Sequence, residues 1–102
     1  MPHTVDKICW AKFSNSGQTC VAPDYIFVQE KVVKRFVADL IECIKRFWGE
    51  KPEGSEQMGK IINDFHLKRL TKLLDTSGGQ VVYGGRVNAE IRHIQPTIIL
   101  NP

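Results

Sequence analysis

Apolar residues recur along this chain at two spacings, and each spacing predicts a kind of element. Residues 4–13 and 29–48 carry apolar positions three or four residues apart, which predicts two helices. The first ends in the run 14–17, whose Ser, Asn and Gly residues favour irregular backbone. The second ends at Trp48, because Gly49 follows it and is suited to terminating a helix.

The second half of the chain predicts a third helix with its own N-terminal cap. Asn63 is suited to the N-cap, and the apolar residues that follow it, from Phe65 to Leu74, recur at helical spacing. The helix should stop before the glycine pair 78–79. Residues 50–59 are polar and contain proline and glycine, which predicts a loop between the second and third helices.

Three short apolar runs predict strands. Residues 25–28 are apolar throughout, as in a strand that is covered on both faces of a parallel sheet. Residues 81–83 and 94–100 are the other candidates, and Pro96 places the last one at a sheet edge or a strand start. This order of elements predicts an α/β domain with a mostly parallel sheet and flanking helices.

The length and composition fit part of a globular protein. With 102 residues the chain holds one domain at most. One long and one shorter helix would cover a parallel sheet thinly, and the first helix would begin before the chain does. We therefore expect residues 1–102 to be part of a larger unit.

Charge and cysteine content exclude several classes of function. The net charge of +3 is spread among acidic residues, as on a solvated helix face, so no nucleic-acid partner is expected. No segment is apolar for long enough to span a membrane, and the first residues lack the apolar run of a signal peptide, so we expect neither feature. The three cysteines form no metal or redox motif, and His3 and His93 lack ligand partners, so we expect free thiols in the cytoplasm and no metal.

Cys20 is the residue with the clearest potential for chemistry. It lies in a loop of small and polar residues between a predicted helix and a predicted buried strand, and Gly17 permits unusual backbone angles there. No Lys, Arg or His lies within five residues of it, so the sequence alone gives no local cause for a lowered pKa. On its chemistry alone, an inert packed cysteine remains an open alternative.

The residues around Cys20 nevertheless resemble the cysteine signature of the aldehyde dehydrogenase superfamily. In that signature an apolar residue, a glycine and a Gln or Glu precede the nucleophilic cysteine, and small residues follow. The residues in these places are Phe13, Gly17, Gln18, Cys20, Val21 and Ala22. The continuation in residues 22–25 is similar to the class 3 and fatty-aldehyde branch, and weaker matches follow in family order in segments 48–49, 58–62, 83–85 and 95–98.

This resemblance implies a nucleophilic mechanism. Cys20 would attack an aldehyde to give a thiohemiacetal, hydride would pass to NAD or NADP, and water would hydrolyse the resulting thioester to a carboxylic acid. The backbone N–H of Cys20 would be one oxyanion donor. The resemblance also implies a small-molecule aldehyde substrate, drawn from lipid aldehyde metabolism, and a full-length homodimer.

Several parts of the family's active site are missing from this sequence. The nucleotide-binding segments, the oxyanion asparagine and the general-base glutamate would precede the cysteine, and a second glutamate motif would follow this chain. Asn15 belongs to the cysteine signature and is not the oxyanion asparagine. Gly78–Gly79 and Gly84–Gly85 are turn glycines rather than a dinucleotide fingerprint. We therefore expect no cofactor-binding residues here, and no turnover by these residues alone.

Other residues that invite a functional interpretation are better explained by packing. Cys9 and Cys43 fall on apolar helix faces and are expected to be core thiols. Gln18 is expected to shape the cysteine loop, and His66 to be a surface or half-buried residue of the third helix rather than a catalytic base. Phe36, Phe47 and Trp48 are expected to belong to the core.

Two other functions compete with that of an enzyme fragment. A truncated, non-catalytic module could associate with itself or with an intact subunit through apolar faces that the missing segments leave uncovered. An unrelated thiol enzyme would instead need His66 or His93 near Cys20 in space, and nothing in the sequence indicates this. Some fatty-aldehyde members are held on membranes by a C-terminal tail that this sequence does not include.

Overall fold

The computed structural model describes residues 2–49 and 59–102. The predicted loop at 50–58, with Met58 of the family-like segment, lies outside these residues. The helices are α1 (Pro2–Phe13), α2 (Val33–Trp48) and α3 (Asp64–Thr76), and the strands are β1 (Gln80–Tyr83), β2 (Val87–Asn88), β3 (His93–Ile94) and β4 (Ile98–Leu100). Single 3₁₀ turns lie at η1 (Ser14–Gly17), η2 (Glu30–Val32) and η3 (Ala89–Ile91).

All three predicted helices are confirmed. The C-terminus of α2 and the N-terminus of α3 lie where the sequence predicted them. Gly49 follows α2 with a φ of 79° and donates its N–H to the carbonyl of Lys45 at 2.8 Å. The left-handed φ is one that glycine adopts cheaply, so the helix stops there. Asn63 caps α3, because its side-chain oxygen accepts the N–H of His66 at 2.9 Å.

The predicted parallel sheet is not found in the described residues. β1 pairs with β4 and β2 pairs with β3, and both pairs are antiparallel. The link between β2 and β3 is the single turn η3 followed by Arg92 in the left-handed region, and so short a link permits only antiparallel pairing. The prediction of one strand over 94–100 was also wrong. It is two strands in different sheets, separated at Pro96, which has no N–H for a ladder.

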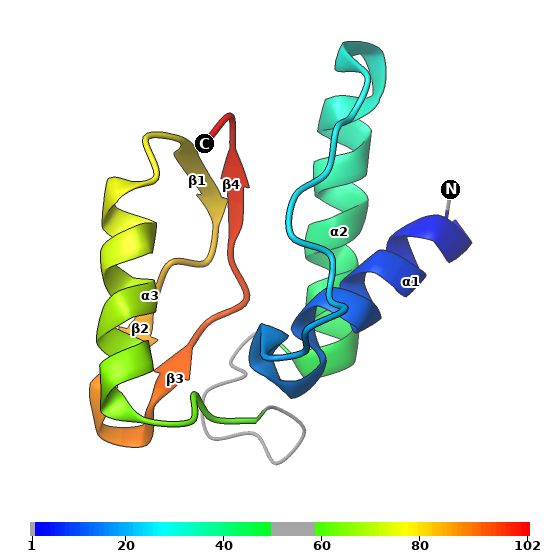
Figure 1. Ribbon diagram of the computed structural model, residues 1–102. Coiled ribbons are helices and arrows are strands. Elements are labelled where there is room, and N and C mark those ends of the chain that lie inside the picture. The colour runs from blue at the N-terminus through cyan, green and yellow to red at the C-terminus, as the bar shows by residue number, and fades with distance from the viewer. Residues whose placement is uncertain (1, 50–58) are drawn as a thin grey trace.

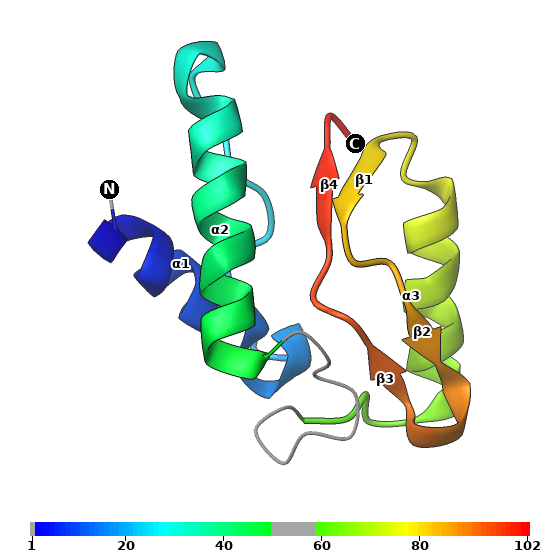
Figure 2. The same ribbon diagram turned by 180° about the vertical axis from the view of Figure 1, so that it is seen from behind.

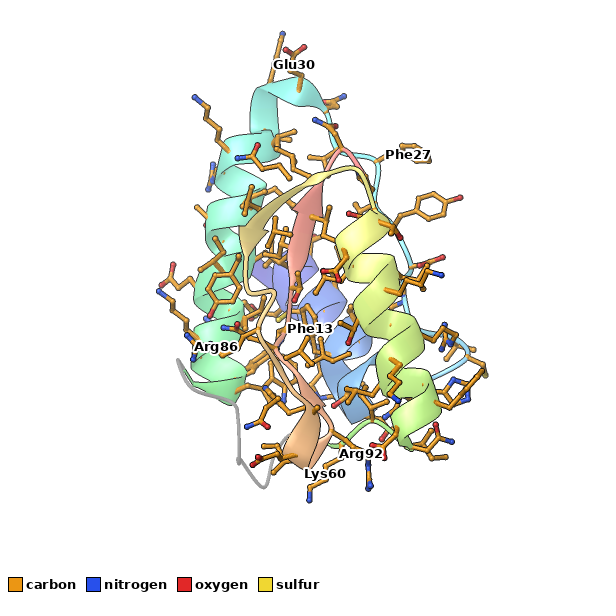
Figure 3. All side chains as sticks on the ribbon, turned by 90° about the vertical axis from the view of Figure 1, so that its left-hand side faces the viewer. Phe13, Phe27, Glu30, Lys60, Arg86 and Arg92 are labelled. Carbon is orange, nitrogen blue, oxygen red and sulfur yellow. The ribbon has the colours of Figure 1, made fainter. Side chains whose placement is uncertain are left out.

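The prediction of a buried strand at 25–28 was wrong. These residues form no strand in the structure, and Tyr25 and Phe27 are 70% and 93% exposed. Phe27 projects away from the rest of the molecule in Figure 3. A strand exists only where another strand satisfies its backbone groups, and no described residue pairs with this segment. Of the four side chains, that of Val28 packs against the core.

The elements form layers with the β1–β4 pair in the middle. Figures 1 and 2 show α1 crossing α2 on one side of this pair and α3 covering the other side. The core lies chiefly between α1 and α2, and its buried members are Val5, Cys9, Phe36, Leu40, Cys43, Ile44 and Trp48. Tyr83 and Ile98 pack against this cluster from β1 and β4, so the sheet and the helices share one core.

The expected aromatic core residues are mostly buried. Phe36 and Trp48 are 8% and 9% exposed, whereas Phe47 is half-buried at the edge of the cluster. Trp48 meets Phe13 and Phe47 edge to face, with ring centroids 5.7 and 5.6 Å apart. Such pairs contribute about 0.5–1.5 kcal/mol each beyond the area they bury. The contact with Phe13 fixes the end of α1, from which the cysteine loop departs.

Candidate active site around Cys20

The loop that leads to Cys20 has an uncommon backbone. Asn15, Ser16 and Gly17 follow α1 with φ values of 55°, 53° and 78°, so three consecutive residues are left-handed. For residues with a side chain this conformation costs on the order of 1–2 kcal/mol each, and Asn tolerates it best. The sequence predicted unusual angles at Gly17 only. Contacts with the rest of the chain must therefore hold the two residues before it.

Those contacts come from a segment more than forty residues away in sequence. The Gln18 side chain donates to the carbonyl of Lys60 at 2.9 Å and accepts the N–H of Ile62 at 2.8 Å. It also donates to the carbonyl of Asn15 at 3.0 Å, within its own loop. The Ser16 hydroxyl donates to the carbonyl of Gly59. We call the three bonds of the Gln18 side chain the Gln18 clamp.

The same segment is also hydrogen-bonded to Arg92, the residue that precedes β3. The N–H of Ile61 donates to the carbonyl of Arg92 at 2.9 Å, and Nε of Arg92 donates to the carbonyl of Ile61 at 2.9 Å. Ile61 is itself 2% exposed. Gly59 lies against the cysteine loop so closely that an added Cβ would be 3.3 Å from Oδ1 of Asn15. Segment 59–62 therefore joins the cysteine loop to the turn before β3.

Cys20 occupies the outer part of a tight turn. The N–H of Ala22 donates to the carbonyl of Thr19 at 3.0 Å, so residues 19–22 form a turn with Cys20 at its second position. The Cys20 side chain is exposed. Among residues 2–49 and 59–102, no group hydrogen-bonds its thiol, and its backbone N–H has no protein acceptor. The turn thus presents, at the same position, a thiol and an N–H that no described residue accepts.

The surroundings of Cys20 are open and apolar. Its neighbour Val21 is 84% exposed, and Tyr25 is 70% exposed. A hollow of about 260 Å³ lies near the start of the loop, and its lining residues are Trp10, Ser14, Asn15, Phe47 and Trp48. Cys20 is not among them, so this hollow does not enclose the thiol.

The histidines do not form a catalytic pair with Cys20 in the described structure. Nδ1 of His66 accepts a hydrogen bond from Nε of Arg69 at 3.2 Å on α3, as expected for a helix-surface residue. His93 is 5% exposed in β3, a burial that the sequence pattern did not predict. No hydrogen bond joins either residue to Cys20 in the described part of the chain. Nothing in the geometry therefore supports a cysteine hydrolase.

The glycine pairs do not fit a dinucleotide site. Gly78–Gly79 leads from α3 into β1, and Gly84–Gly85 leads from β1 towards β2. A phosphate-binding turn leads instead from a strand into a helix, whose N-terminus faces the pyrophosphate. Gly84 has a packing role, because an added Cβ would collide with the carbonyl oxygen of Pro96. Among the described residues, no three acidic, Cys or His side chains are grouped to hold a metal.

Comparison with known proteins assigns the family. A sequence model of the aldehyde dehydrogenase family matches residues 1–102, the whole length of the chain. The chain belongs to the aldehyde dehydrogenase family. Its sequence is 44% identical over 108 residues to the bovine dimeric NADP-preferring aldehyde dehydrogenase, a match covering 96% of this chain and 44% of that protein. It is also 42% identical over 101 residues to mouse aldehyde dehydrogenase family 3 member B2, covering 98% of this chain and 21% of that protein.

A solved structure has the same fold over this region. The substrate-bound state of Staphylococcus aureus AldH superposes with a TM-score of 0.89 at 39% identity, over 93% of this chain and 21% of that one. The resemblance to class 3 aldehyde dehydrogenases is thus confirmed. The matched region makes up 21% to 44% of the length of these relatives. In the described part of the chain, no helix combines the length and apolar character that crossing a membrane requires.

The sequence analysis singled out Cys20 as a candidate nucleophile and Gly17 and Gln18 as residues of its loop, but it missed the residues that hold this loop in place. Ser16, Arg92 and segment 59–62 lie next to one another only in the folded chain. The family-like run at 58–62 was the available signal, since a second motif in family order pointed to a second part of the same site. Its contact partner could not be inferred from a spacing of 42 to 44 residues.

Proposed function

We propose that residues 1–102 form the cysteine-bearing part of the catalytic domain of a class 3-like, NAD(P)-dependent aldehyde dehydrogenase. The whole enzyme would oxidise aldehydes, including lipid aldehydes, to carboxylic acids through a thiohemiacetal and a thioester on Cys20. The observation that carries the proposal is family membership over the full chain together with an exposed thiol on a clamped turn. The word dimeric in the bovine relative's name motivates the further proposal of a homodimer.

The residues of this chain would contribute two functions to the reaction. The Cys20 thiolate attacks the carbonyl carbon, and the electron pair of the C=O bond moves to oxygen. The Cys20 N–H, which no acceptor among the described residues occupies, can then donate to that developing oxyanion. The Gln18 clamp holds the loop before this turn against segment 59–62, which fixes the backbone from which the thiol and the N–H of Cys20 project.

The remaining functions are assigned to other parts of the family enzyme. NAD or NADP, held by other parts of the enzyme, would supply the hydride acceptor, and the described residues provide no fitting site for it. A general base and a second oxyanion donor are likewise not found in this sequence. We therefore propose that the 102-residue chain alone has no aldehyde dehydrogenase turnover. NAD(P)H formation by the isolated chain that a Cys20→Ser variant abolishes would overturn this part of the proposal.

A chimera tests the role of Cys20 directly. Residues 1–102 would replace the matching region of Staphylococcus aureus AldH, which is 39% identical and has the same fold. We expect aldehyde-dependent NAD(P)H formation by the chimera and its loss in the Cys20→Ser version. A Cys43→Ala version is the matched control, because that thiol lies in the core. Retention of activity without the Cys20 thiol would refute the assignment.

The exposed apolar segment favours a second candidate, a non-catalytic module. Val21, Tyr25 and Phe27 are 84%, 70% and 93% exposed and lie close together in sequence. An apolar surface of this kind promotes association with a second copy or with an intact subunit. Sedimentation of the isolated chain distinguishes the two candidates. A clean monomer over a wide range of concentrations would count against the module.

A further inference from the structure

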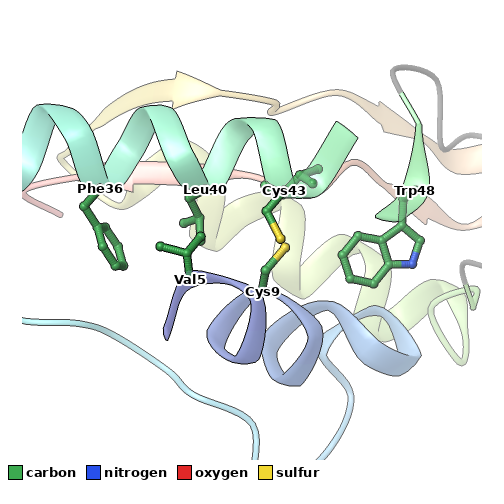
Figure 4. Packing of buried hydrophobic residues seen from close by; sticks show 7 residues of the cluster. Val5, Cys9, Phe36, Leu40, Cys43 and Trp48 are labelled. Carbon is green, nitrogen blue, oxygen red and sulfur yellow. The ribbon is translucent and has the colours of Figure 1, made fainter. Parts of the chain in front are cut away.

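Cys9 and Cys43 face each other across the interface between α1 and α2. Figure 4 shows their sulfur atoms side by side, Cys9 projecting from α1 and Cys43 from α2. The two residues are 0% and 2% exposed and belong to the same core cluster. Both are free thiols in this structure. A disulfide forms without movement of the backbone only where two cysteines are close and their side chains point toward each other. Cys9 and Cys43 project toward each other from two packed helices.

A surface ion pair lies directly over this pair of thiols. Sγ of Cys43 donates to Oδ1 of Asp6 at 3.2 Å, and Nη2 of Arg46 donates to Sγ of Cys43 at 3.5 Å. Arg46 is also paired with Asp6, and the two side chains are 55% and 39% exposed. Cys43 therefore lies just beneath the surface, with a cation beside its sulfur, whereas Cys9 lies behind it.

We propose that Cys9 and Cys43 are a site of reversible disulfide formation that cross-links α1 to α2. The oxidant is a small-molecule disulfide such as oxidised glutathione. The Cys43 thiolate attacks one sulfur of the reagent, which forms a mixed disulfide and releases one glutathione thiolate. The Cys9 thiolate then attacks Sγ of Cys43 and releases the second. Two protein thiols are oxidised, one reagent disulfide is reduced to two thiols, and the two protein protons are taken up by the released thiolates.

Burial keeps both thiols in their unreactive, protonated form until an oxidant is present. Burial, the largest cause, raises the pKa of both Cys9 and Cys43, so both are protonated at neutral pH. The oxidised form would tie the helix that leads into the cysteine loop to the central helix of the core. Cys20 takes no part in this cross-link, since its side chain is exposed on the loop after η1 whereas Cys9 and Cys43 are buried.

The test compares the folded and unfolded states of one protein. A Cys20→Ser form of the 102-residue chain is equilibrated with reduced and oxidised glutathione, with and without urea, and the Cys9–Cys43 cross-link is measured by peptide mapping. Preorganised thiols should give an equilibrium constant for the cross-link at least tenfold larger in the folded chain than in urea. By linkage, the oxidised chain should then melt at a higher temperature, and dithiothreitol should reverse the change.

Variants separate the site from non-specific oxidation. With Cys9→Ala, oxidation should stop at a glutathione adduct on Cys43, and with Cys43→Ala no cross-link should form. An equilibrium constant in the folded chain no larger than that in urea would overturn the proposal. So would a folded chain that accumulates adducts at Cys43 without closing the cross-link. The urea comparison uses the intact pair of cysteines, so it decides the question even if a variant folds poorly.

Discussion

Removing the Gln18 side chain should open the contact between the cysteine loop and segment 59–62. Gln18→Ala eliminates three hydrogen bonds, to Asn15, Lys60 and Ile62, at 3.0, 2.9 and 2.8 Å. Because these bonds are exposed to water, each contributes near the lower end of the usual range, roughly 0.5–0.7 kcal/mol. The two bonds to Lys60 and Ile62 join the loop to the segment, and their sum of roughly 1–1.4 kcal/mol corresponds to a rise of about 5–10-fold in the population of the opened segment.

Amide hydrogen exchange at Ile62 measures this opening, because the Ile62 N–H donates to the side chain that is removed. We expect its protection factor to fall about 5–10-fold in Gln18→Ala, because roughly 1–1.4 kcal/mol of hydrogen bonding is lost between the loop and the segment. Gln29→Ala is the matched control, since Gln29 is exposed and its side chain makes no hydrogen bond in the described structure. Unchanged protection in Gln18→Ala, or an equal loss in Gln29→Ala, would refute the clamp as the element that holds the loop.

Three further predictions concern the stability of the fold. Asn63→Ala removes the N-cap of α3 and should lower the free energy of unfolding by about 1 kcal/mol, measured by urea titration. Ile44→Ala should lower it by about 2–5 kcal/mol, because Ile44 is 0% exposed, whereas exposed Lys45→Ala should change it by less than about 0.5 kcal/mol. Burial raises the pKa of Cys9 above its ordinary 9.0, so the folded state retains a proton that the unfolded state loses. Stability should be independent of this thiol below pH 9 and fall as pH rises above 9, and the fall should be smaller in the Cys9→Ala, Cys43→Ala double variant.

The helices could be predicted because their information is local. The apolar faces of α1 and α2 repeat every three or four residues, and Asn63 and Gly49 mark helix ends through their own side-chain and backbone chemistry. The burial of Cys9 and Cys43 followed from the same spacing. Each of these inferences depends only on residues that are close in sequence. They can therefore be made for part of a fold, without its missing neighbours.

The sheets could not be predicted in the same way, because pairing depends on distant residues. The run at 25–28 has the composition of a buried strand, but burial and pairing require neighbours that the described residues do not supply. Pro96 indicated an edge or strand start, whereas it separates two strands that pair with different partners. At the site, the signature located Cys20, but the contacts of Gln18 and Ser16 with segment 59–62 depend on the folded arrangement.

The left-handed backbone at Asn15, Ser16 and Gly17 has a consequence for chemical synthesis. The chirality of L-residues disfavours this region, and by mirror symmetry the same angles are the relaxed ones for D-residues. Cys20 follows closely enough that residues 1–19, made as a peptide thioester, can be ligated to a segment that starts with Cys20. A D-amino acid at position 15 or 16 should then fit the loop better than its L-enantiomer, which is the reverse of the rule for residues in the right-handed helical and extended regions.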